Sequence, residues 1–229
     1  MGALTRMTTW LEFLASLHAE LKPRCYLEVG VHGVFNGASF RLADENTLAI
    51  GIDPAPSGFV PPRNHQLYQM TSDDYFQYMA DETLHIDFAF IDGSHLFEDA
   101  LRDFINIEMH SNQNTVVVFD DMLPMTQEMS SRYMVPGYWT GDVWKVYQIL
   151  TESRPGLHCV LVDTEPTGTM LVYGLNPRNQ TLMMHYGQLV DKFSIMERVP
   201  DGLLFRTSSV NPEFAINKLN AWLKENGNG

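Results

Sequence analysis

The stretch that decides the fold is Tyr26-Leu-Glu-Val-Gly-Val-His-Gly-Val-Phe-Asn-Gly-Ala-Ser39. It begins as a buried strand interrupted by the carboxylate of Glu28, and continues through three glycines, Gly30, Gly33 and Gly37. An apolar strand, a glycine loop and a following helix are typical of the way a doubly wound α/β sheet opens its cofactor crevice. Glycine lets the backbone approach a ligand, and a helix N-terminus offers free N–H groups.

The glycine spacing argues against a nucleotide pyrophosphate site. The stretch holds neither G-x-G-x-x-G nor G-x-x-x-x-G-K-[ST], so a phosphate-binding loop of either kind is disfavoured. A carboxylate at the junction of strand and loop suits a cationic or amino-bearing ligand better than a phosphate. The alternative is a tight turn of the kind found in any α/β protein.

Length and composition describe one globular domain. The 229 residues are 45% hydrophobic and 19% charged, enough for a full core. A formal net charge of −13 disfavours a nucleic-acid partner and an anionic membrane surface. Cys25 and Cys159 fit buried thiols in a reducing compartment better than a disulfide. With no long apolar run and no signal-peptide pattern, a cytoplasmic protein is expected.

Apolar runs predict seven strands. Five of them alternate with helical patterns, as in a parallel sheet: Cys25–Val29, Leu48–Ile52, Gln66–Met70, Ile86–Ile91 and Thr115–Phe119. The last two, His158–Val162 and Met170–Leu175, flank the turn-like Thr164–Gly168 and predict an antiparallel hairpin.

Helical spacing and capping residues predict the intervening helices. They are expected over residues 4–21, Phe40–Leu48, Thr71 to about Ala80, His95 to about Met109, Asp142 to about Leu150, and from Pro212 onward. The irregular segment Met122–Thr140, rich in Met, Ser, Pro and Tyr, is expected to form a lid or substrate loop.

Carboxylates gather where the predicted strands end. Ligands of such sheets bind outside the carboxyl ends of the strands. Five carboxylates at four strand ends are more than helix capping readily explains. They are Glu28, Asp53, Asp92, Asp120 and Asp121.

The most specific hypothesis is a metal site made by Asp92, Asp120 and Asp121. Neighbouring parallel strands lie about 4.8 Å apart, so these carboxylates can converge on one hard cation such as Mg²⁺. The alternative keeps them as polar residues of strand ends and of a cofactor loop. His95, three residues past Asp92, could serve as general base, since an imidazole has an ordinary pKa of about 6.5. A structural role for this histidine is the competing interpretation.

Other polar residues have weaker assignments. Asp53 is placed to hold a ribose diol, or it is a turn aspartate before proline. Ser72 and Asp73 could reach an adenine edge, with helix capping as the alternative. His32 could contact a cofactor or pack. Trp144 and Lys145 could face the site, although capping and packing explain them as well.

Four motifs in register resemble a known family. They are Leu27-Glu-Val-Gly30, Gly51-Ile-Asp53, Ile86-Asp-Phe-Ala-Phe-Ile-Asp-Gly-Ser-His95 and Val118-Phe-Asp-Asp121. Their order and spacing resemble class I S-adenosylmethionine-dependent methyltransferases, in particular the macrocin and mycinamicin sugar O-methyltransferases and the cephalosporin hydroxylase-like proteins. The resemblance covers about residues 24–175. It implies a Rossmann-like, doubly wound α/β sheet of seven strands, mostly parallel with the last strand antiparallel, and helices on both faces.

The resemblance also implies roles for individual residues. It implies Mg²⁺ at Asp92, Asp120 and Asp121, and His95 as base. The family's glycine pattern corresponds here to Gly33, Gly37 and Ser39, so the loop carries about three extra residues. The resemblance implies that Glu28 and the glycine loop hold the methionine end of S-adenosylmethionine and that Asp53 holds its ribose. Together with the residues weighed above, the predicted cofactor contacts are Glu28, Gly30, Val31, His32, Asn36, Gly37, Ser39, Asp53, Ser72, Asp73 and Asp92.

The sequence therefore predicts one methyltransferase domain over residues 1–229. Its parts are an N-terminal helix within 1–23, a cofactor-binding core over 24–175 and a C-terminal extension over 176–229. The expected reaction is methyl transfer from S-adenosylmethionine to a hydroxyl of a small molecule, a sugar or a natural-product intermediate, assisted by Mg²⁺. The alternatives are a metal-independent methyltransferase and a non-catalytic binding protein of the same fold. A homodimer through the first and last helices is also considered.

Overall fold

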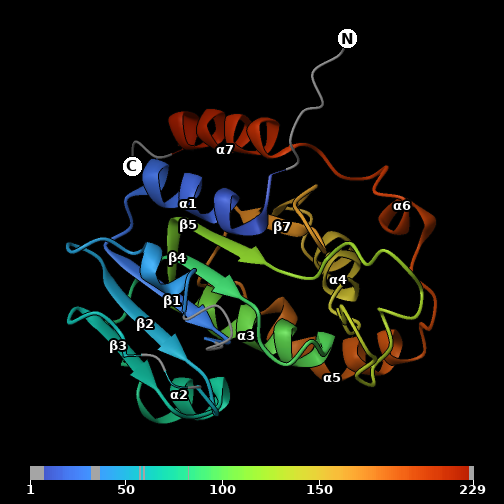
Figure 1. Cartoon of the computed structure of the whole chain (residues 1–229), viewed down its shortest axis with the longest axis horizontal. Helices are drawn as coiled ribbons and strands as arrows, with labels where there is room; N and C mark the ends of the chain where they lie inside the picture. The colour runs from blue at the N-terminus through green and yellow to red at the C-terminus, as the bar shows by residue number, and fades with distance from the viewer. Residues whose placement is uncertain (1–7, 32–36, 57, 59, 82, 227–229) are drawn as a thin grey trace.

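A seven-stranded sheet with the order β3-β2-β1-β4-β5-β7-β6 organises the molecule (Figure 1). The computed structural model describes residues 8–31, 37–56, 58, 60–81 and 83–226. β7 runs antiparallel to both of its neighbours and the other pairs are parallel, so the predicted sheet and its hairpin are confirmed. The strands are β1 Cys25–Val29, β2 Leu48–Ile52, β3 His65–Tyr68, β4 Ile86–Ile91, β5 Ser111–Phe119, β6 His158–Val162 and β7 Thr169–Tyr173.

Helices cover both faces of this sheet, as predicted. α1 and α7 lie on one face, and α3, α4 and α5 lie on the other (Figure 1). The helical elements are α1 Trp10–Leu21, the 3-10 turn η2 Phe40–Leu42, α2 Ser72–Tyr78, α3 Phe97–Met109, α4 Lys145–Ser153, α5 Thr181–Ser194, α6 Asp201–Leu204 and α7 Pro212–Asn226.

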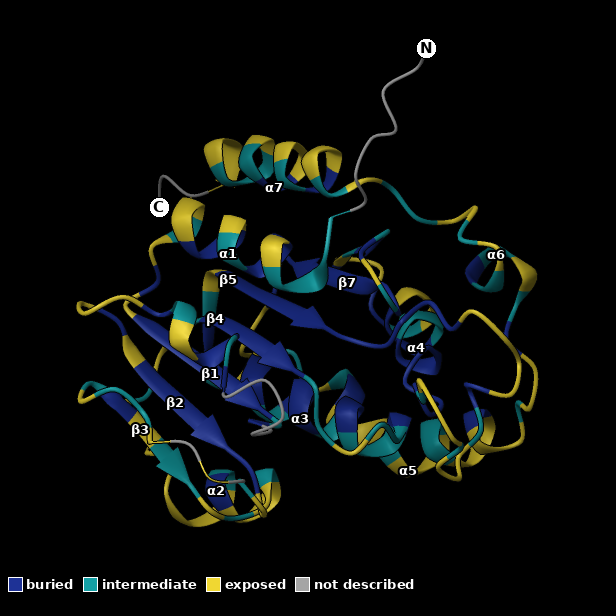
Figure 2. Ribbon diagram, in the orientation of Figure 1, coloured by how far each residue is buried: buried dark blue, intermediate teal, exposed yellow. Residues whose placement is uncertain are grey.

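The central strands are buried on both faces, which explains why they read as unbroken apolar runs (Figure 2). Tyr26 and Phe88 pack under α1, whereas Leu27 and Ala89 face the core beneath α3. The period of two along each strand therefore fills two separate cores. Glu28 interrupts this pattern as a buried carboxylate near the end of β1.

α1 begins at a capping box. The Thr9 hydroxyl accepts the Glu12 N–H and the Glu12 carboxylate accepts the Thr9 N–H, so the helix starts at Trp10, and residues 8 and 9 lie outside it. The predicted start at residue 4 lies outside the described residues. Leu14 and Leu17 of α1 and Leu219 of α7 are buried against the sheet. Both helices thus cover the sheet of their own chain.

The predicted helix over Phe40–Leu48 is wrong. Only one 3-10 turn, Phe40–Leu42, forms there. Asp44 ends it, because its Oδ1 accepts the backbone N–H of Asn46 and the hydroxyl of Thr47 in an Asx turn. The first helix after β1 therefore offers no long helix N-terminus to a ligand.

Other boundaries also differ from prediction. β3 begins and ends earlier than Gln66–Met70, and β5 begins four residues before Thr115. Asp142 does not cap α4, whose N-cap position is Trp144. The segment beyond Pro177, which the sequence pattern left unassigned, holds α5 and α6.

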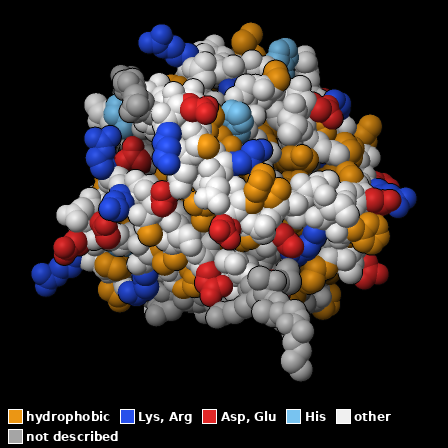
Figure 3. All heavy atoms as spheres, turned by 90° about the horizontal axis from the view of Figure 1, so that it is seen from above, with side chains coloured by type: hydrophobic (Ala, Val, Ile, Leu, Met, Phe, Trp, Pro, Cys, Tyr) orange, Lys and Arg blue, Asp and Glu red, His pale blue; other side chains and the backbone are white. Residues whose placement is uncertain are grey.

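The outer surface over α1 and α7 mixes both signs of charge. In Figure 3, which looks onto this side of the molecule, Asp and Glu side chains lie interspersed with Lys and Arg side chains. Among the described residues, this view shows no basic patch of the kind that nucleic-acid binding needs. None of the described helices combines the length and apolar character that a bilayer crossing requires.

We expect Gly30→Ala to destabilise the fold. Gly30 has φ +90°, and a Cβ there would lie 1.8 Å from the backbone oxygen of Asp92. Backbone strain and overpacking together should cost about 2–4 kcal/mol in urea unfolding. Gly187→Ala in α5 is the matched control, because that Cβ meets no atom within 4 Å. It should stabilise the protein by about 0.5–1 kcal/mol; equal effects of the two changes would contradict this explanation.

Candidate active site

A cavity of about 1620 Å³ opens at the carboxyl ends of the strands. Glu28 and Gly30 reach it from β1, Asp53 from β2, and Asp92 and Asp120 from β4 and β5. The strand order reverses between β1 and β4, so the cavity lies at the topological switch point of the sheet. The sequence-predicted strand-end carboxylates therefore meet at one site.

Most of the predicted cofactor residues border this cavity. Val31 instead packs in the core beneath α1, and Gly37 is buried away from the lining. His32 and Asn36 lie outside the described residues. Those that line the cavity are Glu28, Gly30, Ser39, Asp53, Ser72, Asp73 and Asp92.

Glu28 is almost fully buried and already has two donors. Its Oε2 accepts the Tyr26 hydroxyl at 2.6 Å, and its Oε1 accepts the Ser39 hydroxyl at 2.7 Å. Burial raises the pKa of Glu28 to about 7, although both hydrogen bonds oppose that shift. Ser39 is therefore fixed by its bond to Glu28 near the end of β1.

The polar residues after β2 and β3 are held by local contacts. The Asp53 Oδ1 accepts the N–H of Ala55 at 2.7 Å, which leaves its other carboxylate oxygen for a ligand hydroxyl. Thr71, not Ser72 or Asp73, caps α2. Asp73 instead accepts from Arg102 at 2.7 Å. The capping alternative for Ser72 and Asp73 is therefore wrong.

Asp103 is a buried residue of α3 at the cavity wall. Its raised pKa should be visible in the pH dependence of the free energy of unfolding. Burial raises its pKa to about 7, against a hydrogen bond from Ser72. The folded protein thus keeps a proton that the unfolded chain releases above about pH 4. Stability is therefore lost as the pH rises from about 4 to about 7.

We expect Asp103→Asn to remove this loss. Relative to the parent protein the variant should gain about 1.4 kcal/mol for each pH unit crossed in that window. Urea unfolding between pH 4 and pH 8 measures the gain. Asp191→Asn, an exposed change on α5, is the control and should leave the profile unchanged. A constant difference between Asp103→Asn and the parent at all pH values would contradict the assignment.

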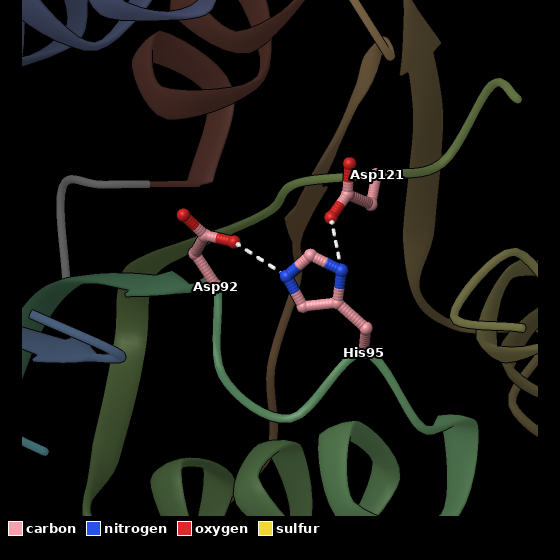
Figure 4. Close-up of side chains that lie close together, drawn as sticks. All are labelled: Asp92, His95 and Asp121. Atoms are coloured by element: carbon pink, nitrogen blue, oxygen red, sulfur yellow. Dashed lines mark ion pairs between the residues drawn. The ribbon is translucent and has the colours of Figure 1, made fainter. Parts of the chain in front are cut away.

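His95 lies between two carboxylates (Figure 4). Its Nδ1 is 3.0 Å from the Asp121 Oδ2, and its Nε2 is 3.7 Å from the Asp92 Oδ1. Nδ1 also lies 2.8 Å from the backbone oxygen of Trp139, whose indole stacks on the imidazole. The predicted place of His95 at the start of the helix is wrong, because α3 begins at Phe97 and His95 lies in the loop before it.

These contacts fix the tautomer of a neutral His95. A carbonyl oxygen can only accept, so Nδ1 must carry the hydrogen and donate it to the Trp139 carbonyl, with the Asp121 carboxylate beside the same nitrogen. Nε2 then keeps its lone pair and has no hydrogen-bond partner among the described residues, since 3.7 Å is too long. The ring therefore presents a basic nitrogen at a partly open position.

His95 and Asp121 both have strained backbone conformations. His95 and Asp121 have φ +60° and +63°, a region that non-glycine residues seldom occupy. The His95 carbonyl accepts the Asp142 N–H at 3.1 Å, which helps to hold the loop. Strained residues of this kind gather at functional sites, where surrounding contacts hold them in place.

The acidic residues here repel one another. Burial, then Asp120 and Asp121, raise the pKa of Asp92, and burial followed by Asp121 raises that of Asp120. The Oδ1 of Asp120 is buried without a hydrogen-bond partner among the described residues. A second cavity of about 10 Å³ adjoins these carboxylates, a volume on the scale of one water or ion.

One donor of the predicted metal site differs from expectation. Asp92, His95 and Asp121 offer ligand atoms within 4.8 Å of one another, and Asp120 is not part of that group. An imidazole therefore takes the place of the third carboxylate. Carboxylate oxygens suit Mg²⁺, and an added imidazole nitrogen also suits transition metals.

The segment Met122–Thr140 has neither helix nor strand, as predicted, and borders the cavity. Met125, Met134 and Tyr138 are exposed along it, whereas Trp139 stacks on His95. Trp144 and Lys145 are buried outside the lining, so for them packing is the correct alternative.

Sequence reasoning missed residues whose partners are distant along the chain. Trp139 contacts His95 over 44 positions, and Asp103 lies on the buried side of a helix. An aspartate at an apolar position of the α3 stripe was the one available signal for Asp103. No local pattern marks Trp139 or the cavity residue Glu165.

Comparison with known proteins agrees with this geometry. Residues 27–122 match the family model of a methyltransferase domain. A comparison with curated proteins gave no match. Three similar solved structures are described in turn below, and at their identities the likeness establishes the fold.

The cofactor-bound Rv0187 from MTB is 16% identical, with a TM-score of 0.57 over 76% of this chain and 83% of that chain. The O-methyltransferase TomG from Streptomyces achromogenes, solved with SAM, is 16% identical, with a TM-score of 0.56 over 72% and 79%. The O-methyltransferase from Bacillus cereus, in complex with SAH, is 14% identical, with a TM-score of 0.51 over 72% and 80%.

Proposed function

We propose that the chain is a class I S-adenosylmethionine-dependent methyltransferase that methylates a hydroxyl oxygen of a small molecule, with His95 as general base; the match of residues 27–122 to a methyltransferase domain supports the proposal. The observation that carries this proposal is the hydrogen-bond arrangement of His95. Its Nδ1–H is held by Trp139 and Asp121, and its Nε2 is left with a free lone pair beside the cavity. A sugar or a natural-product intermediate is the proposed kind of acceptor.

S-adenosylmethionine supplies, when bound, an electrophilic methyl group on its sulfonium. The cavity half at β1 and β2 suits its polar parts. Asp53 keeps one carboxylate oxygen for a ribose hydroxyl, and the acidic strand ends suit an amino group. The volume of about 1620 Å³ exceeds that of an ordinary small-molecule pocket and leaves room for an acceptor beside the cofactor.

His95 removes the proton that the reaction releases. The hydroxyl proton passes to Nε2 while the oxygen lone pair forms the new bond to carbon. The Trp139 carbonyl, which accepts from Nδ1–H, and the Asp121 carboxylate, 3.0 Å from Nδ1, stabilise the resulting imidazolium. Met122–Thr140 covers the acceptor side and keeps water away.

A divalent cation fits the same place. The carboxylates of Asp92 and Asp121 are the groups that would hold Mg²⁺, and His95, the third member of that group, would keep its Nε2 for the proton. The ion would lower the pKa of the acceptor hydroxyl. In the metal-independent alternative, His95 and the positioning of the acceptor act alone.

Two measurements, each made in Mg²⁺ and in EDTA, test the cofactor and the metal. Calorimetry measures the binding of S-adenosylhomocysteine, and a turnover assay measures methyl transfer. We expect binding in both buffers, with Asp53→Asn weakening it by about tenfold, the scale of one charge-assisted hydrogen bond. Absence of binding would overturn the methyltransferase proposal. Methyl transfer that persists in EDTA would overturn only the proposed role of Mg²⁺. Binding of S-adenosylhomocysteine without any methyl transfer would favour the non-catalytic alternative. Homodimer formation and a cytoplasmic location stay predictions.

A further inference from the structure

The acceptor side of the cavity combines an apolar wall with negative charge. It lies beyond His95, over β5 and the turn that leads into β7. Trp10, Met134, Tyr138 and Trp139 line it, and Met134 and Tyr138 are mostly exposed. Exposed apolar side chains at a cavity mouth indicate a ligand with an apolar face.

Positive charge in this cavity is already paired. Nine of the described lining side chains are carboxylates and two are guanidiniums. Arg102 donates to Asp73, Asp99 and the Tyr186 hydroxyl. Arg206 donates to Asp163 and to backbone carbonyl oxygens. Neither arginine is left for a phosphate or carboxylate of an acceptor, and no lysine lines the described part of the cavity.

One carboxylate on the acceptor side is unpaired. Glu165 is exposed, and its side chain makes no hydrogen bond or ion pair with the described residues. Backbone hydrogen bonds fix its position beside Trp10, because the Trp10 N–H donates to the Glu165 carbonyl at 3.1 Å. An aromatic ring next to a free carboxylate is a recognition pattern for an ammonium group. The buried Oδ1 of Asp120, which has no hydrogen-bond partner among the described residues, adds an unpaired hydrogen-bond acceptor to the same cavity.

We propose that the acceptor is a hydroxyl compound carrying a protonated amine. Its apolar face lies on the wall of Trp10, Met134 and Tyr138, and its ammonium group faces Glu165. Anionic acceptors such as phosphate esters or carboxylates are disfavoured, because Glu165 would repel them and both lining arginines are already paired. This inference rests on the proposed function, since it names the substrate class of the same site.

The test uses two matched trios of probes, with saturating S-adenosylhomocysteine present. Tyramine, tyrosol and 4-hydroxyphenylacetate share a phenol, and glucosamine, glucose and glucuronate share a sugar. Calorimetry should find the cationic member of at least one trio bound ten or more times tighter than the anionic member, the scale expected for like-charge repulsion. Glu165→Gln should weaken the cation about two- to fivefold.

The controls separate this inference from the proposed function. Glu197→Gln removes an exposed carboxylate elsewhere and should not change the preference. Equal affinities within both trios, tighter binding of the anions, or no binding of either cation while S-adenosylhomocysteine still binds would overturn the inference alone. Loss of S-adenosylhomocysteine binding by the parent protein would instead remove the proposed function.

Discussion

His95→Ala is expected to lower the rate of methyl transfer by roughly 10²–10⁴-fold, the usual contribution of a general base. The alanine removes Nε2, the nitrogen whose lone pair the Trp139 and Asp121 contacts leave free. Release of S-adenosylhomocysteine, with the acceptor probe that the parent protein methylates fastest, measures the loss. The dissociation constant of S-adenosylhomocysteine should change little, because the cofactor half lies over β1 and β2.

Two further variants make that result specific. His185→Ala removes an exposed histidine of α5 and should retain the parent rate. Trp139→Phe keeps an aromatic ring over His95 and the backbone carbonyl at residue 139, so it should lose much less than His95→Ala. A His95→Ala variant that keeps more than about one tenth of the parent rate would rule out general-base catalysis by this residue.

The strands were predictable because burial on both faces leaves a simple signal. β1, β2 and β4 are short, mostly apolar runs with a carboxylate at or next to the end, and their predicted bounds match the structure. The same signal placed Glu28, Asp53 and Asp92 at one edge of the sheet, since parallel strands end at the same side. Residues fixed by the sheet were therefore within reach of sequence reasoning.

Residues whose positions depend on tertiary contacts could not be predicted from the sequence. Phe40–Leu48 has a helical pattern, but the Asx turn at Asp44 overrides it within one turn. Asp142 resembles a helix cap and instead accepts the first N–H of α3, at Phe97, from 45 positions away. Periodicity reports which side of an element is apolar, and it carries no information about which distant polar group will be its partner.

Asp142→Ala is expected to cost about 3–5 kcal/mol of stability, because it strands a buried charge. The Asp142 Oδ2 accepts from the Lys145 Nζ at 2.8 Å and from Arg132 at 2.7 Å. Its Oδ1 accepts the Phe97 N–H at 3.1 Å. Lys145 is 2% exposed, so without Asp142 its ammonium group has no water to replace the lost partner. Urea unfolding measures the loss.

Lys145→Met is the matched comparison, since it removes the other member of the pair. Asp142 would keep the Arg132 guanidinium and the Phe97 N–H, so this change should cost only about 1–2 kcal/mol. Asp142→Ala combined with Lys145→Met should be less damaging than Asp142→Ala alone, because no buried ammonium group remains. A larger loss for Lys145→Met than for Asp142→Ala would show that Asp142 is not the residue holding Arg132, Lys145 and the start of α3 together.

If the expected order holds, Asp142→Ala should also increase hydrogen exchange across Met122–Thr140, because Arg132 anchors that segment to Asp142 and Glu98.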